Sequence, residues 1–459
     1  MEYISTRNTQ GTFSFKDVFL KGMAPDGGLF IPKKIPQFLS EELESFRNLS
    51  YNDLATKIIF KFCGEEFNEN EIQDLVKVSY KNFRVQNVVS IKKLEEINLL
   101  ELFHGPTLAF KDIAMQIIGN MYEKILEKNN LKVNVVVATS GDTGAAAINA
   151  IKDRKNMKIF VLHPDKKISD VQRRFMTTVS SKNVFNIALD GNFDDCQKLV
   201  KSMFADKNFS NSINISAVNS INWSRIVIQI VYYFFSYFKI SKESKKINFS
   251  VPTGNFGDIY AGYIAKKMGL PINKLIIATN KNDILKRVIE TGIYKPMQVE
   301  HTVSPSMDIQ VASNFERLIF DICSCDSSKT LKLMNDLNKK GEFKLEKEEV
   351  KKIRENFSSE SLSDKETKII IKEIYENQKI LIDPHTAVGI GVMKKILPEG
   401  DTIILATAHP SKFSEIVMKE TNVKPELPEN LKSILEKKEK YEKLSKDLKN
   451  VKNYILQRV

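Results

Sequence analysis

From Leu99 onward, short apolar runs alternate with amphipathic stretches along the chain. The run from Val133 to Thr139 is continuous and rich in β-branched residues, as expected for a strand covered on both faces. Similar runs follow at residues 157–164, 183–191, 247–254, 274–280 and 401–410. This alternation is typical of an α/β fold with a largely parallel sheet. Each run ends in small or polar residues, and open α/β sheets bind ligands at that edge.

Other stretches show helical periodicity. Within the first 95 residues, an irregular start is followed by predicted helices over 50–62 and 69–80. The apolar run 226–238 is well short of the roughly 20 residues that a membrane helix needs, so it predicts a buried core helix. Residues 324–375 are highly charged and mostly helical by pattern, with 358–367 as a surface loop. Residues 431–459 predict an amphipathic helix packed on the body, with coiled-coil association as the alternative.

Composition indicates a soluble globular protein, with 459 residues, 42% hydrophobic and 27% charged side chains. The net charge of +12 does not predict a nucleic-acid partner, because lysines are spread along the chain beside acidic residues. Four scattered cysteines do not make a disulfide framework, which fits a reducing cytoplasm. Cys323 and Cys325 have no second pair at zinc-ligand spacing, so no metal site is predicted. The chain starts without the apolar run of a signal peptide, and we expect a cytoplasmic protein without a membrane partner.

Lys111 differs from most lysines of this chain, because it follows an apolar and small-residue segment, ELFHGPTLAF, and opens an apolar helix. A lysine drawn out of water has a lowered pKa, and its neutral amine can condense with an aldehyde. The alternative is a lysine at a helix start that reaches the surface.

Two loops have the composition of anion-binding turns between a strand and a helix. One contains Gly254, Asn255, Phe256, Gly257 and Asp258, and it favours a single phosphate because it lacks the dinucleotide and triphosphate patterns. The other runs from Thr139 to Gly144 and would suit a carboxylate or a second phosphate. Each loop could also be a plain connection.

Two further segments carry polar residues at the ends of apolar elements. Asn219, Ser220, Asn222 and Arg225 open the apolar helix. A buried Arg225 would need an anion, or alternatively an acidic side chain from elsewhere. Thr407 and His409 follow the last apolar run, and His409 alone would more often be an interior histidine than a catalytic one.

The order of these motifs, HGPTLAFKD, ATSGDTG, NSINWSR, PTGNFGD and ATAHPSKF, resembles that of the threonine synthase family. The segments YISTRN and APDGGLFIP extend the resemblance from the first residues to about Phe413. It implies the α/β, two-domain architecture of fold type II pyridoxal-phosphate enzymes, similar to the tryptophan synthase β-subunit, with an N-terminal mostly helical region. The implied cofactor is pyridoxal 5'-phosphate, held between the two domains.

The resemblance also implies roles for individual residues. Lys111 would carry the Schiff base, and Thr407 would face the pyridine nitrogen. The cofactor phosphate would lie in the loop formed by Gly254, Asn255, Phe256, Gly257 and Asp258. The substrate's α-carboxylate would lie at Ser140, Gly141, Asp142 and Thr143, and its phosphate at Asn219, Ser220 and Arg225. Many relatives of this fold have Asn at the place of Asp142, where it contacts the cofactor's phenolic oxygen, so the protonation of Asp142 is left open.

The implied reaction converts O-phospho-L-homoserine and water to L-threonine and phosphate by γ-elimination and β-addition, the last step of threonine biosynthesis. The alternatives are a phospho-lyase or a serine/threonine dehydratase of the same fold, which would release a keto acid, or a noncatalytic binding protein. We expect a monomer or a homodimer. The predicted regions are 1–95 (N-terminal), 96–240 (Schiff-base lysine and substrate loops), 241–430 (cofactor phosphate loop) and 431–459 (C-terminal helix).

Overall fold

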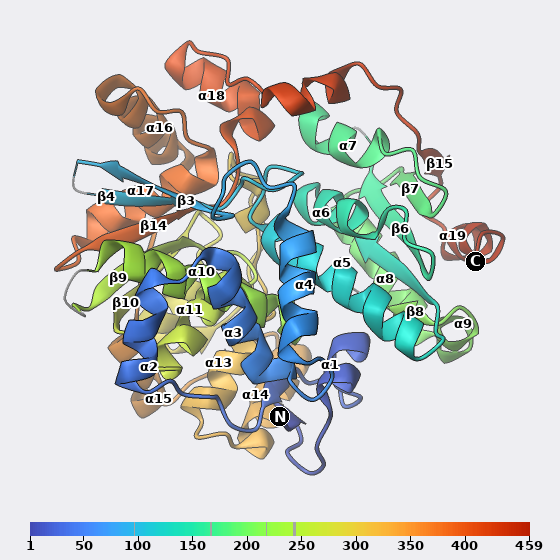
Figure 1. Cartoon of the computed structure of the whole chain (residues 1–459), viewed down its shortest axis with the longest axis horizontal. Helices are drawn as coiled ribbons and strands as arrows, with labels where there is room; N and C mark the ends of the chain where they lie inside the picture. The colour runs from blue at the N-terminus through green and yellow to red at the C-terminus, as the bar shows by residue number, and fades with distance from the viewer. Residues whose placement is uncertain (96, 166–167, 217, 242–244) are drawn as a thin grey trace.

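Two mainly parallel sheets, each with its own helices, form the body of the protein in the computed structural model. The structure describes residues 1–95, 97–165, 168–216, 218–241 and 245–459. In Figure 1 the larger sheet lies on the left and the smaller on the right, with the C-terminal helix beside the smaller. The N-terminus lies at the bottom of this view near α1 and α14, and the C-terminus lies at the right beside α19.

The larger sheet has the strand order β13-β10-β9-β14-β4-β3, and only β3 and β4 pair in the antiparallel sense. Its strands are β3 Ser90–Leu94, β4 Ile97–Glu101, β9 Ile247–Pro252, β10 Ile272–Thr279, β13 Phe357–Ser361 and β14 Thr402–Ala406. The smaller sheet is parallel, with the order β15-β7-β6-β5-β8. Its strands are β5 Val133–Ala138, β6 Met157–Pro164, β7 Val184–Leu189, β8 Ile215–Ser216 and β15 Glu442–Leu444.

The helices fall into three groups along the chain. The N-terminal region contains α1 Phe15–Lys21, α2 Ser40–Ser45, α3 Tyr51–Cys63 and α4 Glu69–Tyr80. Helices that follow or flank the smaller sheet are α5 Lys111–Lys128, α6 Asp142–Ile151, α7 Asp170–Thr177, α8 Phe193–Ala205, α9 Lys207–Ser212 and α19 Leu448–Leu456. The others are α10 Trp223–Ile240, α11 Gly257–Lys267, α12 Ile284–Thr291, α13 Phe315–Ile322, α14 Ser327–Lys340, α15 Lys347–Asn356, α16 Asp364–Gln378, α17 Pro384–Ile396 and α18 Ser414–Thr421.

Short elements complete the chain. Two small antiparallel pairs join β1 Tyr3–Ser5 to β2 Phe30–Pro32 and β11 Ile293–Tyr294 to β12 Phe343–Lys344. Short 3-10 helices are η1 Phe46–Asn48, η2 Pro305–Met307, η3 Pro410–Phe413 and η4 Glu429–Leu435.

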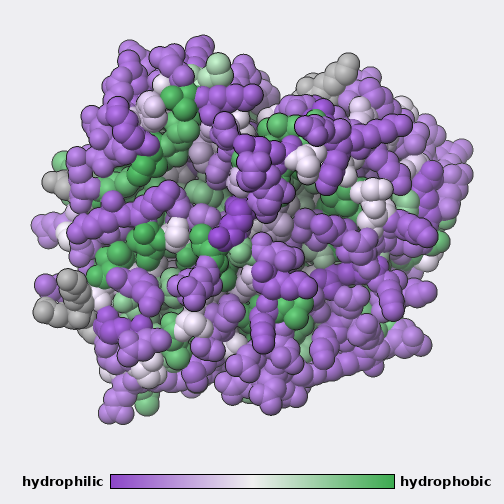
Figure 2. Space-filling view, turned by 45° about the horizontal axis from the view of Figure 1, so that its top comes forward, coloured by the Kyte–Doolittle hydropathy of each residue, from purple (hydrophilic) through white to green (hydrophobic). Residues whose placement is uncertain are grey.

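Most of the patterns read from the sequence are confirmed. The helices expected at 50–62 and 69–80 are α3 and α4, and the apolar runs are strands of the two sheets. Helix α10 is the predicted core helix, because all its residues from Trp223 to Phe238 are buried. Among the described residues, none of the helices combines the length and the apolar character needed to cross a bilayer. Figure 2 shows a mostly hydrophilic face on which apolar side chains are exposed in separate small areas.

The predicted surface loop at 358–367 is wrong. Residues 357–361 form β13, an edge strand paired with β10, and Ser363 then begins a capping box with Glu366 at the start of α16. The strand is only half-buried after its first residue, so it has no apolar run for the sequence to reveal.

The single C-terminal helix predicted over 431–459 is also wrong. The tail begins as η4, adds β15 to the edge of the smaller sheet beside β7, and forms a helix only at α19. The domain boundaries stay predictions. Strands from different predicted regions pair with each other across the boundaries at 240/241 and 430/431. Strand β4 pairs with β14 of the larger sheet, and β15 from the tail joins the smaller one.

We expect Ile455→Ala to lower the free energy of unfolding by about 2–5 kcal/mol. Ile455 is fully buried on α19, in an apolar cluster with Val136, Phe160 and Cys196 from the smaller sheet and α8. Leu456→Ala is the matched control, because this neighbour is 46% exposed and should change stability by only about 0.5 kcal/mol. Urea unfolding measures both variants, and equal effects would mean that α19 does not pack as described.

Candidate active site

Lys111 is the first residue of α5, and its side chain is 12% exposed. The preceding loop fixes its position, because the Phe110 amide donates a hydrogen bond to the Thr407 carbonyl over 2.9 Å. Lys111 therefore lies beside the carboxyl end of β14. Burial lowers the pKa of Lys111 below its usual value; the carboxylate of Asp142 opposes this shift, and the charges of Lys412 and Arg225 add to it.

The loop before Lys111 is shaped by a buried carboxylate. Asp112 accepts hydrogen bonds from the Thr107 amide and hydroxyl at 2.7 and 2.6 Å. Gly105 packs so closely on this side chain that a Cβ atom there would lie 2.3 Å from the Asp112 Cβ. The HGPT motif therefore forms a tight turn that presents Lys111 at the helix start.

Asp142 is the first residue of α6 and faces Lys111, with 3.4 Å between Lys111 Nζ and Asp142 Oδ2. Its Oδ1 accepts hydrogen bonds from Lys412 Nζ at 2.6 Å and from Gln172 Nε2 at 2.8 Å. Burial alone would raise the pKa of Asp142, but the charges of Lys412 and Lys111 lower it far below the usual range. The two lysine charges therefore favour the ionised form of the Asp142 carboxyl group.

The rest of that loop forms the start of α6. Gly141 has φ +136°, a conformation that disfavours side chains, and Thr139 Oγ1 accepts hydrogen bonds from the Gly141 and Gly144 amides. Ser140 is exposed and Thr143 is half-buried. The loop has the geometry of an anion-binding helix start close to Lys111.

The segment Gly254–Asp258 joins β9 to α11. Phe256 is left-handed at φ +65°, and the helix starts at Gly257 with no side-chain cap, which leaves its first amides available to an anion. Gly254 packs against the backbone of η2, where a Cβ atom would lie 2.8 Å from the Ser306 carbonyl oxygen. The turn therefore has the form expected of a phosphate site.

The Asp258 carboxyl group accepts hydrogen bonds from two tyrosine hydroxyls. Its Oδ1 accepts hydrogen bonds from the Tyr232 and Tyr233 hydroxyls at 2.5 and 2.9 Å, whereas Oδ2 is buried without a partner. Burial raises the pKa of Asp258 to about 6, although both phenols and the charges of Arg225 and Lys111 act in the opposite direction. The charges of Arg225 and Lys111 thus both favour the ionised form of Asp258.

Arg225 is 4% exposed near the start of α10, and its Nη1 has no hydrogen-bond partner. Burial lowers the pKa of Arg225 to about 10, with Tyr232 and Asp258 opposing the shift. Among the residues that the structure describes, no carboxylate forms an ion pair with Arg225, so the acidic partner considered from the sequence is not found there. A buried guanidinium of this kind is suited to bind an anion.

The neighbouring polar residues hold the backbone of this segment. Asn219 and Ser220 are half-buried, and Asn219 Oδ1 accepts the Ile221 amide. Asn314, which sequence reasoning missed, donates from Nδ2 to the carbonyls of Ser220 and Asn255 at 3.1 and 3.0 Å. The Asn314 side chain therefore links the Asn219–Ser220 segment to the Gly254–Asp258 turn.

Lys412 is a second missed residue. It lies on η3 and is fully buried, and its Nζ contacts Asp142 and the Thr107 carbonyl. The test that singled out Lys111, a lysine in an apolar setting, also fits the PSKF sequence and would have found it. His409 lies next to η3, where its Nδ1 is 2.7 Å from Ser411 Oγ, and burial lowers the pKa of His409 to about 4.

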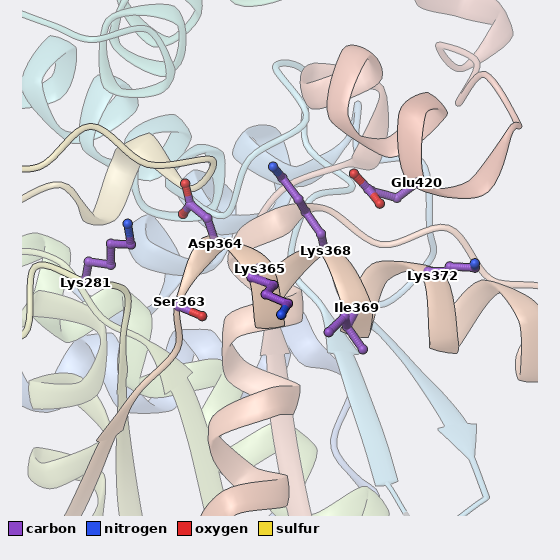
Figure 3. Close-up of a pocket in the computed structure, with 8 residues that line it drawn as sticks. All are labelled: Lys281, Ser363, Asp364, Lys365, Lys368, Ile369, Lys372 and Glu420. Atoms are coloured by element: carbon purple, nitrogen blue, oxygen red, sulfur yellow. The ribbon is translucent and has the colours of Figure 1, made fainter.

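A surface hollow lies apart from these residues. Its lining contains none of the predicted site residues and is made of Lys281, Ser363, Asp364, Lys365, Lys368, Ile369, Lys372 and Glu420. In Figure 3 Lys372 points away from Lys281 and Asp364, so the charges do not converge on one point. No group of His, Cys, Asp or Glu in the described part of the chain is arranged to hold a metal ion.

Asp258→Asn should change how stability depends on pH. Because the pKa of Asp258 is raised to about 6, the folded cofactor-free protein keeps a proton there that the unfolded chain loses near pH 4. The wild type is therefore destabilised by this group as the pH rises from about 4 to about 6, and the variant is not. Urea unfolding at both ends of that range should show the variant gaining stability relative to the wild type. If the variant instead lost stability relative to the wild type over this range, the buried placement of Asp258 would be contradicted.

Similar proteins extend over the whole chain. It is 41% identical over 461 residues to a threonine synthase of Pseudomonas aeruginosa, covering 100% of this chain and 98% of the relative. It is 42% identical to a threonine synthase of Saccharomyces cerevisiae, covering 99% and 97% of the two chains. The crystal structure of a PLP-bound threonine synthase from Brucella melitensis matches with a TM-score of 0.97 and 42% identity, covering 100% of this chain and 99% of that one.

Residues 88–407 match the family of pyridoxal-phosphate dependent enzymes. Together with the two-sheet fold and the buried lysine, this match defines a pyridoxal-phosphate-dependent enzyme of fold type II. Residues 2–80 match the threonine synthase N terminus, and residues 386–455 match the threonine synthase C-terminal family. The chain belongs to the threonine synthase family. The predictions of family, fold class, cofactor and lyase class are thereby confirmed, whereas the roles of single residues stay predictions.

Proposed function

We propose that the protein converts O-phospho-L-homoserine and water to L-threonine and inorganic phosphate, the last step of threonine biosynthesis. The observation that carries this proposal is the buried guanidinium of Arg225, whose Nη1 has no hydrogen-bond partner and whose charge acts on Lys111. A phosphorylated amino acid supplies the anion that this guanidinium lacks.

The residues present fit pyridoxal phosphate. A buried lysine with a lowered pKa and an uncapped helix start at Gly257 are the two features that an aldehyde with an anionic tail would require. When bound, the cofactor would supply the aldehyde that reacts with amines and a ring that takes up electrons from the substrate's α-carbon. In this proposal the Gly254–Asp258 turn holds the cofactor phosphate, and Thr407 faces the ring nitrogen.

Separate residues of this protein would then transfer the proton, bind the substrate's carboxylate and bind its phosphate. The amine of Lys111, once replaced by the substrate's amine, is neutral and placed to take the α-proton. The amides at Ser140–Thr143 bind the α-carboxylate, and Arg225 with the Asn219–Ser220 segment holds the γ-phosphate and stabilises it as it leaves. Burial of Lys111, Asp142 and Arg225 keeps water away from these charges until the phosphate has departed.

Product analysis separates this proposal from a dehydratase or phospho-lyase of the same fold. Incubation with pyridoxal phosphate and O-phosphohomoserine should release threonine and phosphate in equal amounts. Phosphate accompanied by 2-oxobutyrate instead of threonine would contradict the proposal and favour the alternatives. We further propose a cytoplasmic enzyme that acts as a monomer or homodimer without nucleic acid; four cysteines without disulfides among the described residues fit a reducing compartment.

A further inference from the structure

We propose that Lys412 is a positioning residue: it neutralises Asp142 and so keeps the amine of Lys111 uncharged and able to react with the cofactor. This inference rests on the proposed role of Lys111. It concerns a residue that never needs to touch the substrate.

Three segments meet at the Lys412 ammonium group. Its Nζ lies 2.6 Å from Asp142 Oδ1 and donates to the Thr107 carbonyl over 2.8 Å, and the side chain is 0% exposed. Thr107 belongs to the turn before Lys111, Asp142 to the start of α6, and Lys412 to the segment that follows β14 of the larger sheet. The Lys412 backbone is also fixed, because its carbonyl accepts a hydrogen bond from Ser169 Oγ at the start of α7.

Asp142 thus lies between two lysines at unequal distances. The carboxylate is 2.6 Å from Lys412 but 3.4 Å from Lys111, so the closer ion pair belongs to the residue outside the proposed chemistry. Gln172 takes a further hydrogen-bonding position on the same Oδ1 atom. Lys111 is left with only the longer contact to the other oxygen.

The physical consequence follows from the cost of burying charge. A buried carboxylate with one lysine as its sole ionic partner would hold that lysine as an ammonium ion, because neither charge can be left unpaired in a water-poor site. Lys412 supplies the compensating charge in place of Lys111. The electrostatics agree, because Lys412 acts to lower the pKa of Asp142 and also that of Lys111.

The test is the pH dependence of covalent capture of pyridoxal phosphate. The neutral Lys111 amine condenses with the aldehyde, forming a C=N bond and releasing water, and borohydride then adds hydride to fix the link. The full-length protein is digested after the reaction, and the yield of reduced cofactor on the Lys111 peptide after a short fixed time, measured by mass spectrometry, reports the fraction of neutral amine. Lys412→Met should move the midpoint upward by about 1–3 pH units.

Three further variants, each of which removes a charged side chain, make the test specific. Asp142→Asn alone should move the midpoint downward, because Lys111 then faces Lys412 without a compensating carboxylate. The double variant Lys412→Met/Asp142→Asn should return toward the wild-type midpoint. Lys267→Met is the matched control: its Nζ is also 2.6 Å from a buried carboxylate, that of Asp321, but outside the proposed site, so its midpoint should not move.

Each result has a defined meaning. A wild-type midpoint in folded Lys412→Met, or an upward shift in Asp142→Asn, would overturn the inference about Lys412. If Lys412→Met alone does not fold, Asp142→Asn is compared with the double variant, because the two differ only at residue 412; equal midpoints would likewise overturn the inference. Failure of the wild type to capture the cofactor at Lys111 would instead overturn the proposed function.

Discussion

Replacing Lys111 with alanine is expected to abolish turnover of O-phosphohomoserine together with the visible absorption of the covalently bound cofactor. The variant loses both the amine that bonds the aldehyde and the proposed base for the α-proton. General base catalysis alone contributes about 10²–10⁴-fold to a rate, so activity should fall by at least this factor. Absorption spectra and a phosphate-release assay on the purified variant measure the two losses.

Lys128→Ala is the matched control, since Lys128 is the last residue of the same helix and pairs with Glu71 at the surface. It should keep the chromophore and the activity. If the Lys111 variant behaved like this control, the cofactor would have to be bonded elsewhere.

Arg225→Met is expected to weaken binding of O-phosphohomoserine far more than binding of an unphosphorylated amino acid such as L-threonine. The Arg225 guanidinium is buried and has a free Nη1, so a phosphate bound there would be desolvated and paired directly. Truncating one partner of such a buried pair costs about 2–5 kcal/mol, which is about 30- to 4,000-fold in affinity. Titration of the cofactor absorption with each amino acid gives both dissociation constants.

An arginine outside the site provides the comparison. Arg287 pairs with Asp283 on α12 over 2.8 Å, and Arg287→Met should leave both dissociation constants unchanged. Equal losses of the two ligands in Arg225→Met would remove Arg225 from the phosphate site and leave the substrate phosphate without its proposed partner.

The sequence predicted which loops converge because each follows a strand of a largely parallel sheet. The Gly254–Asp258 turn follows β9, Thr407 follows β14, and the Asp142 loop follows β5. Carboxyl ends of parallel strands gather at one edge of a sheet, so local patterns placed the Gly254–Asp258 turn and Thr407 at the same edge of the larger sheet. The Asp142 loop belongs to the smaller sheet, so its contact with Lys111 depends on how the two sheets pack, which no local pattern shows. The burial of Lys111 was visible in its apolar neighbours.

What the sequence did not reveal depends on contacts between distant segments. The ion pair of Lys412 with Asp142 joins the two sheets, and the Asn314 bridge joins two loops, so neither has a local pattern. Strand β13 is a half-buried edge strand, and its residues after Phe357 are polar. The pairing of β15 with β7 depends on a partner far away along the chain, and periodicity around it suggested a helix.

The most direct test of the central claim is to locate the lysine that binds the cofactor. Wild-type protein loaded with pyridoxal phosphate would be reduced with borohydride, digested, and its peptides sequenced by mass spectrometry. We predict the reduced cofactor on the peptide that contains Lys111. Its presence on another lysine, Lys412 included, or on none, would contradict the account.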